Sequence, residues 1–379
     1  MSIIPSLRVV KPVFKKNQPD DSFKFQPLPK PTGKYPYQLK LAEVIPEFTA
    51  DKMVFHLVGD TGGIKSPRFQ QLIASEMAQQ YTEAMDSDST PKFLFHLGDI
   101  VYHFGEADQY YNQFFKPYGV YPGPIFAIAG NHDSDVNILN PKPYASLSAF
   151  KEVFCAAEPL TVPFSGGAAR KSMIQPNVYW SLDTPLATII GLHSNVPKFG
   201  VITPEQREWF VETLKKADQE RPDKAVIVCI HHAPYSADTN HGSSIPMITF
   251  LEGVFEETGI KPDAVFSGHV HNYQRFSKHY ADGSTVPFIV CGAGGFDELH
   301  SLALTTDPNF TTVNPLFDDV ELESFSELKH GFLKISLEKT DEGLTLTGSY
   351  YTIPHDERPD ESEKSVLADE FVLELGKTV

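Results

Sequence analysis

Six apolar runs along the chain each end in a polar or glycine-rich segment. They are MVFHLVGD (53–60), KFLFHLGD (92–99), IFAIAGNHD (125–133), AVIVCIHH (225–232), DAVFSGHVH (263–271) and PFIVCGAGG (287–295). Short runs of this kind, rich in Val, Ile, Leu and Phe, are typical of strands that are buried on both faces. We therefore predict buried strands that carry polar residues at their carboxyl ends.

Two segments between these runs have the pattern of amphipathic helices. Ser66 and Pro67 begin the first, and its predicted apolar face consists of Phe69, Leu72, Ile73, Met77 and Tyr81. The second is TPEQREWFVETLKKA (203–217), with Thr203 as the N-cap, Pro204 at the first helical position and Gln206 closing a capping box. Alternation of strands and helices predicts an α/β layered fold, with functional groups on the loops at the strand ends.

The two ends of the chain differ from this central pattern. Residues 1–50 are rich in Pro and Lys and weakly patterned, which predicts an extended N-terminal arm. Residues 51–379 are predicted to form a single catalytic domain. Near its end, GFLKISLEKTDEGLTLTGSYYTI (331–353) predicts a hairpin that turns near Asp341, Glu342 and Gly343.

Composition and charge restrict the possible functions. The chain has 379 residues, of which 41% are hydrophobic, and a formal net charge of −17. Such a chain is expected to be globular, and its charge argues against binding of nucleic acid or of an anionic membrane. A site for phosphate would then need local positive charge, for which metal ions are the obvious source. The N-terminus has no signal-peptide pattern, so the chain as given is expected to be cytoplasmic, or periplasmic or secreted if a signal has been removed.

The polar strand ends carry a set of oxygen and imidazole ligands. In chain order they are Asp60 (GDTG), Asp99 and Tyr102 (GDIVY), Asn131 and His132 (GNHD), His231 and His232 (IHHAP), and His269 and His271 (GHVH). Taken singly, each has a structural explanation, such as a turn or a helix cap for the aspartates. Five such strand ends in one chain instead predict a site for a hard or borderline metal ion such as Fe(III), Zn(II) or Mn(II), without cysteine ligands.

The order GD-x-G, GD-x-x-Y, GNH, H-x-P and GH-x-H resembles the metallophosphoesterase (calcineurin-like) superfamily, and in particular its purple acid phosphatases. The similarity spans roughly residues 53–295. Most members of the superfamily have a His two residues after the first Asp. This chain has Gly62 there, and Tyr102 matches the ligand that distinguishes the purple branch. The resemblance implies a layered β-sandwich flanked by helices, in the order α/β/β/α.

The resemblance also implies a dinuclear metal centre held by seven side chains. One site would consist of Asp60, Asp99, Tyr102 and His271, and the other of Asp99, Asn131, His232 and His269, with Asp99 shared. A tyrosine phenolate requires a strongly acidic ion, which indicates Fe(III) in the first site. Fe(II), Zn(II) or Mn(II) is expected in the second.

His231 and His232 compete for one ligand position. In the family the ligand precedes one residue and then a proline, and a further histidine follows nine positions later. His232 with Pro234 and His241 fits this spacing, whereas a looser V-x-x-H pattern would select His231. We favour His232.

The resemblance implies hydrolysis of phosphomonoesters through attack by a metal-activated hydroxide, as in acid phosphatases. His132 and His241 would orient the phosphate and protonate the leaving oxygen. Two alternatives remain: a phosphodiesterase acting on nucleotides or cyclic nucleotides, and a metal-binding protein without activity. A phosphate ester is the expected partner, with no nucleic acid and no membrane, and the sequence does not determine the oligomeric state.

Overall fold

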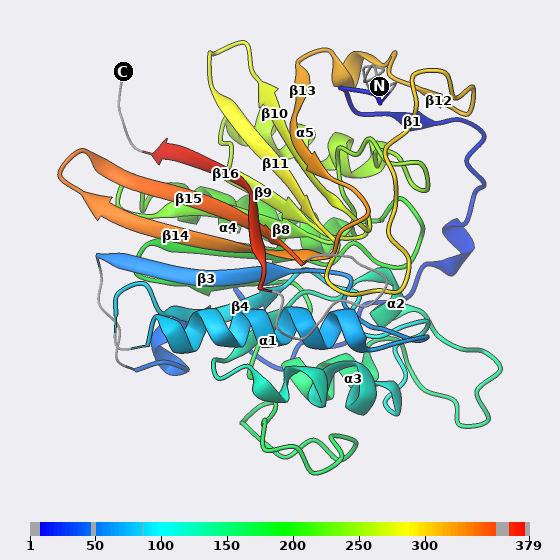
Figure 1. Ribbon diagram of the computed structural model, residues 1–379, viewed down its shortest axis with the longest axis vertical. Helices are drawn as coiled ribbons and strands as arrows, with labels where there is room; N and C mark the ends of the chain where they lie inside the picture. Colours follow the sequence, from blue (N-terminus) through cyan, green and yellow to red (C-terminus); the bar gives the residue numbers. More distant parts are fainter. Residues whose placement is uncertain (1–7, 47–50, 86, 354–363, 376–379) are drawn as a thin grey trace.

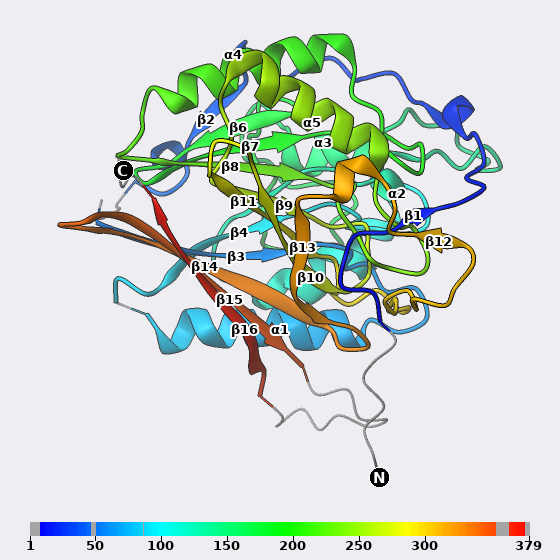
Figure 2. The same ribbon diagram turned by 90° about the horizontal axis from the view of Figure 1, so that it is seen from above.

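The structure of the protein, a computed structural model, describes residues 8–46, 51–85, 87–353 and 364–375. Two large sheets lie face to face, and helices cover their outer surfaces (Figures 1 and 2). This arrangement confirms the predicted layered α/β sandwich. None of the helices within the described ranges combines the length and apolar character needed to cross a bilayer.

The eight-stranded sheet contains, in spatial order, β13 (Val320–Ser326), β10 (Tyr273–His279), β11 (Thr285–Cys291), β9 (Ala264–Ser267), β8 (Ala225–Ile230), β7 (Ala187–Leu192), β6 (Trp180–Asp183) and β2 (Gln38–Lys40). The six-stranded sheet contains β16 (Val366–Leu375), β15 (Gly343–Thr352), β14 (Gly331–Thr340), β3 (Lys52–Val58), β4 (Pro91–His96) and β5 (Ile125–Ala127). The strands from β3 to β5 are parallel, as are β7, β8, β9 and β11. In each parallel set, the carboxyl ends therefore lie along one edge of the sheet.

The helices are divided between the two outer faces. Figure 2 shows α4 (Pro204–Asp218) and α5 (Ile245–Thr258) over the eight-stranded sheet, and α1 (Arg68–Glu83) over the six-stranded sheet. The short helices α2 (Asn131–Ser134) and α3 (Ser148–Phe154) follow β5.

The space between the sheets is filled by aromatic and aliphatic side chains from both of them. Phe95 and Trp180, for example, are stacked with ring centroids 5.9 Å apart, one from each sheet. At the rim, Arg275 of β10 is hydrogen-bonded through Nε to Asp369 of β16 at 2.8 Å, which links the sheets by an ion pair. The apolar runs identified in the sequence are therefore buried because each faces a layer on both sides.

Three predicted local features can be compared with the structure. The hairpin of residues 331–353 is confirmed as β14 and β15, in which Thr340 pairs with Gly343 at the turn. The helix cap at Thr203 is also confirmed, because its Oγ1 accepts the backbone N–H of Gln206. The predicted capping box is wrong. The Gln206 side chain instead binds both backbone groups of His193 at 2.8 Å, and this contact docks α4 on the loop after β7.

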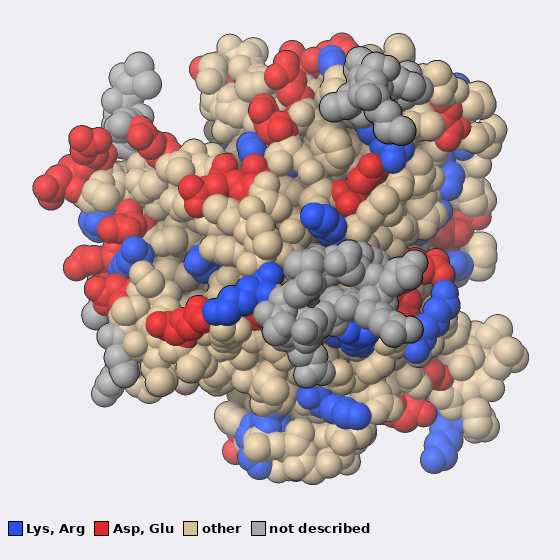
Figure 3. Space-filling view, viewed as in Figure 1, with Lys and Arg blue, Asp and Glu red and all other residues tan. Residues whose placement is uncertain are grey.

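Residues 8–46, the described part of the predicted N-terminal arm, run along the edge of the molecule (Figure 2). This arm contributes β2 to the large sheet, and β1 (Phe14–Lys15) forms a small antiparallel pair with β12 (Phe310–Thr311). Figures 1 and 2 show β1 and β12 on the same side of the molecule as α2. Figure 3 shows acidic side chains gathered at the far end of the β14–β15 hairpin, on the left, and in smaller groups elsewhere on this face.

Candidate metal centre

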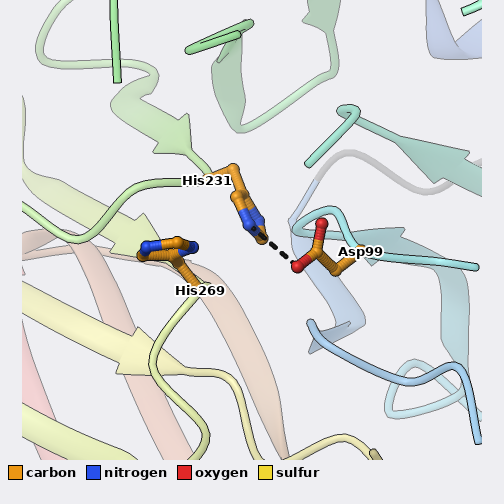
Figure 4. Close-up of side chains that lie close together, drawn as sticks. All are labelled: Asp99, His231 and His269. Carbon is orange, nitrogen blue, oxygen red and sulfur yellow. Dashed lines mark ion pairs between the residues drawn. The ribbon is translucent and has the colours of Figure 1, made fainter. Parts of the chain in front are cut away.

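The polar strand ends converge where the two sheets meet. Asp60, Asp99 and Asn131 follow β3, β4 and β5 of the six-stranded sheet, while the histidine pairs 231–232 and 269–271 follow β8 and β9 of the other sheet. Figure 4 shows Asp99, His231 and His269 approaching one another from separate loops. One ligand atom from each of these three lies within 4.8 Å of the others. The sandwich therefore places side chains from both sheets around one small volume.

Asp60, Tyr102 and His271 form the first part of this cluster. The Tyr102 hydroxyl lies 3.3 Å from Asp60 Oδ1 and 3.3 Å from His271 Nε2. His271 is oriented by its Nδ1, which lies 2.8 Å from the backbone carbonyl of Glu298. A carbonyl acceptor on Nδ1 leaves the lone pair on Nε2, which is the tautomer that a metal ligand needs.

The Tyr102 ring explains why residue 62 is glycine. A Cβ atom at Gly62 would lie 2.8 Å from Tyr102 Cδ2 and even closer to Gln113 Oε1. A histidine at this position would therefore displace the tyrosine. The two departures from the common superfamily pattern, a missing His and an added Tyr, depend on each other sterically.

Asp99, Asn131 and His269 form the second part. Asn131 Oδ1 lies 2.9 Å from His269 Nδ1. Asp99 Oδ1 accepts the backbone N–H of His132 at 2.9 Å, and Asp99 Oδ2 faces His231 Nε2 at 3.3 Å. After burial, the charge of Asp99 contributes to the raised pKa of both Asp60 and Tyr102, so Asp99 is also close to the first part.

The adjacent histidines after β8 have different surroundings. Both nitrogens of His231 are engaged, Nδ1 with the Leu97 carbonyl at 2.8 Å and Nε2 with Asn131 Oδ1 at 3.1 Å. His232 Nδ1 lies 2.7 Å from Ser194 Oγ, while its buried Nε2 has no hydrogen-bond partner in the described part of the chain. The His232 ring lies against that of His269, with centroids 4.2 Å apart. The geometry therefore supports two alternative ligand sets, one with each histidine.

The charges of the cluster favour cations. Burial raises the pKa of Asp60 well above its ordinary value, and the nearby Asp99 raises it further, although the charge of His231 opposes this. Burial and the two carboxylates also raise the pKa of Tyr102. In addition, His232 Nε2, His269 Nε2 and His241 Nδ1 are buried without partners among the described residues. Buried carboxylates and unpartnered imidazole nitrogens are costly unless a cation binds them, so this donor set fits metal ions.

The backbone at the site adopts conformations that non-glycine residues rarely use. Asp60, Asp99 and His269 have φ of 58°, 54° and 68°, respectively. Left-handed conformations of this kind cost about 1–3 kcal/mol each and cluster at functional sites. The backbone of Gly130 packs directly against Asp99, because a Cβ at Gly130 would lie 2.1 Å from Asp99 Oδ1.

The two histidines predicted to act on substrate border the cluster. The ring of His132 lies 4.4 Å from that of Tyr102 and is partly exposed. The ring of His241 lies 4.1 Å from that of His269. Burial lowers the pKa of His241 to about 3, so its imidazole is neutral in the free protein unless a bound anion raises that pKa.

The structure adds two residues that the sequence did not indicate. His300 stacks on His271 with ring centroids 4.3 Å apart, and its Nδ1 lies 3.0 Å from Asp238 Oδ2. Asp238 in turn accepts the backbone N–H groups of Asn240, His241 and Gly242. Neither residue belongs to a motif, so only the folded arrangement reveals that they support the loop of His241.

Comparison with known proteins gives three findings. The model of the calcineurin-like phosphoesterase family matches residues 53–273, which is more than half of the chain. Among relatives, purple acid phosphatase 21 of Arabidopsis thaliana is 31% identical over 134 residues, or 33% of this chain and 28% of the relative. The probable purple acid phosphatase 20 of the same plant is 29% identical over 176 residues, or 45% of this chain and 35% of the relative. The matches thus span about a third of these plant proteins.

Among solved structures, GAP50, the anchor in the inner membrane complex of Plasmodium, has a TM-score of 0.51 at 16% sequence identity. The similarity covers 86% of this chain and 89% of that one. At this level of identity it concerns the fold alone.

Proposed function

Because the chain belongs to the calcineurin-like phosphoesterase family, we propose that it hydrolyses phosphate monoesters at a dinuclear metal centre of the purple acid phosphatase type. The observation that carries this proposal is the position of the Tyr102 hydroxyl, 3.3 Å from both Asp60 and His271. A tyrosine at this point, with Gly62 making room for it, is what separates the purple branch from phosphodiesterase-like relatives. The plant relatives support the same branch.

The first metal would be held by Asp60, Asp99, Tyr102 and His271, and we assign Fe(III) to it because a phenolate favours a strongly acidic ion. The second, Fe(II), Zn(II) or Mn(II), would be held by Asp99, Asn131, His232 and His269. We keep His232 in this set because its Nε2 and that of His269 both lack partners among the described residues and their rings lie 4.2 Å apart, whereas both nitrogens of His231 are already engaged. In the protein without metal ions, His231 acts as a cationic partner for Asp99. Burial lowers the pKa of His231, but the charges of Asp99 and Asp60 outweigh burial and raise it to about 9.

The bound metal ions would supply positive charge for the phosphoryl oxygens and lower the pKa of a water molecule. His132 and His241 would contact the remaining phosphoryl oxygens from the two sides of the cluster. We assign proton donation to His132, because burial keeps the imidazole of His241 neutral in the free protein. His241, neutral in the free protein, would act first as a hydrogen-bond donor to the phosphate. Asp238, which binds the backbone of its loop, holds it in place.

The proposal is tested by turnover of a phosphomonoester and a phosphodiester with the same leaving group, on the purified protein loaded with iron and zinc. We expect kcat/KM for the monoester to exceed that for the diester. A preference for the diester would instead favour a nucleotide or cyclic-nucleotide phosphodiesterase. Stoichiometric metal without turnover of either would favour a metal-binding protein.

Tyr102→Phe is expected to remove a visible absorption band of the oxidised, iron-loaded protein. The band would arise from charge transfer from the phenolate to Fe(III), and the substitution removes one hydroxyl while the ring keeps its packing on Phe296, 4.0 Å away. Loss of the phenolate should also raise the reduction potential and weaken iron retention. The measurements are a visible spectrum and an iron assay. A colourless wild-type protein with stoichiometric oxidised iron would contradict the tyrosine ligand, but not the other six.

His241→Ala is expected to slow turnover on the order of 10²-fold, the usual scale for a group that orients or protonates a substrate. Both metals should remain bound, because His241 is not in either proposed ligand set. Metal analysis beside steady-state kinetics checks this. Asn309→Ala provides a control, because Asn309 is exposed and its side-chain amide contacts Asp307 in its own loop. A lost metal in His241→Ala would show that the ligand assignment around β8 is wrong.

A further inference from the structure

The N-terminal arm reaches the loop that carries His241. The backbone N–H of Val13 donates to the Ser236 carbonyl at 2.8 Å, and the Val13 carbonyl accepts the N–H of Ser243 at 2.8 Å. These bonds dock the arm on both ends of the segment 236–243. Lys15, two residues further along the arm, is thereby held beside this segment.

Two lysines meet at the residue before His241. Lys15 Nζ donates to the backbone carbonyl of Asn240 at 2.7 Å, and Lys198 Nζ, from the loop after β7, reaches the same oxygen at 3.5 Å. Both ammonium groups therefore lie beside one peptide group. Two separate segments of the chain place positive charge at this single point.

Neither ammonium group has an ion-pair partner within 4.0 Å among the described residues, unlike Lys65, Lys224 and Lys339. Each uses one of its three N–H groups on the Asn240 carbonyl, which leaves donors for a ligand. Burial lowers the pKa of Lys198, and the charge of Lys15 lowers it further. Asp21 and Asp238 oppose this shift, while Lys24 adds to it. An anion between the lysines would relieve their mutual repulsion.

The lysines are connected to the candidate centre through His241. Asn240 is bonded to His241, whose ring contacts that of the proposed ligand His269 at 4.1 Å. The two ammonium charges also contribute, after burial and His300, to the low pKa of His241. A phosphoryl group at the metals would thus have His241 on one side and, beyond it, the two lysines.

We propose that Lys15 and Lys198 bind a second anionic group of the substrate, so that the preferred substrates are phosphate esters whose leaving group carries a further phosphate or carboxylate. This inference rests on the proposed phosphomonoesterase function and adds the substrate class. The overall charge of −17 favours such a device, because the protein as a whole repels a multiply charged anion. Two local cations beside the metals offset that repulsion where the substrate binds.

The test compares three substrates on one scaffold: glycerol 3-phosphate, 3-phosphoglycerate and 2,3-bisphosphoglycerate. Their leaving groups are neutral, a carboxylate, and a carboxylate with a second phosphate. In the wild type, kcat/KM should rise along this series at low salt and the differences should shrink as salt is added. The double variant Lys15→Gln with Lys198→Gln should lower the ratio of charged to neutral substrate on the order of 10-fold. If the double variant loses more kcat/KM on 3-phosphoglycerate, the lysines bind the carboxylate. If it loses more on 2,3-bisphosphoglycerate, they bind the second phosphate.

Lys16→Gln is the matched control, because Lys16 is an exposed neighbour whose Nζ donates to the Pro308 carbonyl, away from His241. It should leave the ratio unchanged. An unchanged ratio in the double variant, with wild-type turnover present, would overturn the inference and leave the proposed function intact. If the metal-loaded wild type turns over none of the three, the proposed function fails. Binding of 2,3-bisphosphoglycerate by calorimetry then decides on the lysines: weaker binding by the double variant supports them, and equal binding overturns them.

Discussion

Replacing Asp99 with asparagine is expected to abolish turnover and to lower the metal content of both sites. Asp99 is buried in the cluster, where one oxygen accepts the His132 N–H and the other faces His231, and we assign it to both ions. An amide has nearly the same shape but cannot compensate the charge of two ions. We expect kcat/KM to fall by at least about 10³-fold, since metal assistance contributes several kcal/mol and each 1.4 kcal/mol is tenfold.

Metal analysis and kinetics under metal saturation measure this effect. Circular dichroism must accompany them, because the substitution also removes the partner of the buried His231 side chain. Asp133→Asn is a useful comparison. Asp133 is equally buried in the same region, but its carboxylate accepts the backbone N–H groups of Ile100, Val101 and Gly130 and contacts no proposed ligand side chain. Full turnover and normal metal content in Asp99→Asn would refute a shared carboxylate.

His232→Ala is expected to reduce the metal content from about two ions per chain to about one, with turnover falling by at least about 10²-fold. The reason is that the free Nε2 of His232 is assigned to the second ion. Ser194→Ala should weaken that ion more mildly, by about 10- to 100-fold in affinity, because Ser194 Oγ orients the ring through Nδ1. Titration of metal-free protein with Zn(II) measures both effects.

His231→Ala is the decisive comparison. If His232 is the ligand, His231→Ala should still bind two ions at saturating metal while losing stability, because the Leu97 carbonyl and Asp99 lose their partner. The opposite result, in which His231→Ala loses one ion and His232→Ala keeps two, would assign the ligand to His231. The close grouping of His231 with Asp99 and His269 is the structural basis for that outcome.

The sequence predicted those parts of the fold that depend on local pattern. Buried strands were predictable because both faces of β3, β4 and β8 are covered, so their residues are apolar without alternation. The hairpin of β14 and β15 was predictable from its alternating residues and its Asp-Glu-Gly turn. The insertion of β14 beside β3 was not, because nothing local in either strand specifies a partner almost three hundred residues away.

The candidate site shows the same limit. Residues within motifs, such as Asp60 and His271, could be selected because their types and spacing are unusual together. His300 and Asp238 could not, since each stands alone in the sequence and acquires its role by contact with His271 and with the loop of His241. Gln206 shows how a local rule fails: its amide satisfies the backbone of His193, a partner that its own helix does not provide.

The division of the site between the two sheets couples metal binding to folding. Asp60, Asp99 and Asn131 belong to loops of the six-stranded sheet, whereas the histidines after β8 and β9 belong to the eight-stranded sheet. An ion bound between these loops would therefore link the two sheets, and the sheets could not separate at that edge without releasing the ion. By linkage, the free energy of metal binding is added to the stability of the whole protein. Loss of the metal ions would thus lower the stability of this protein as well as its activity.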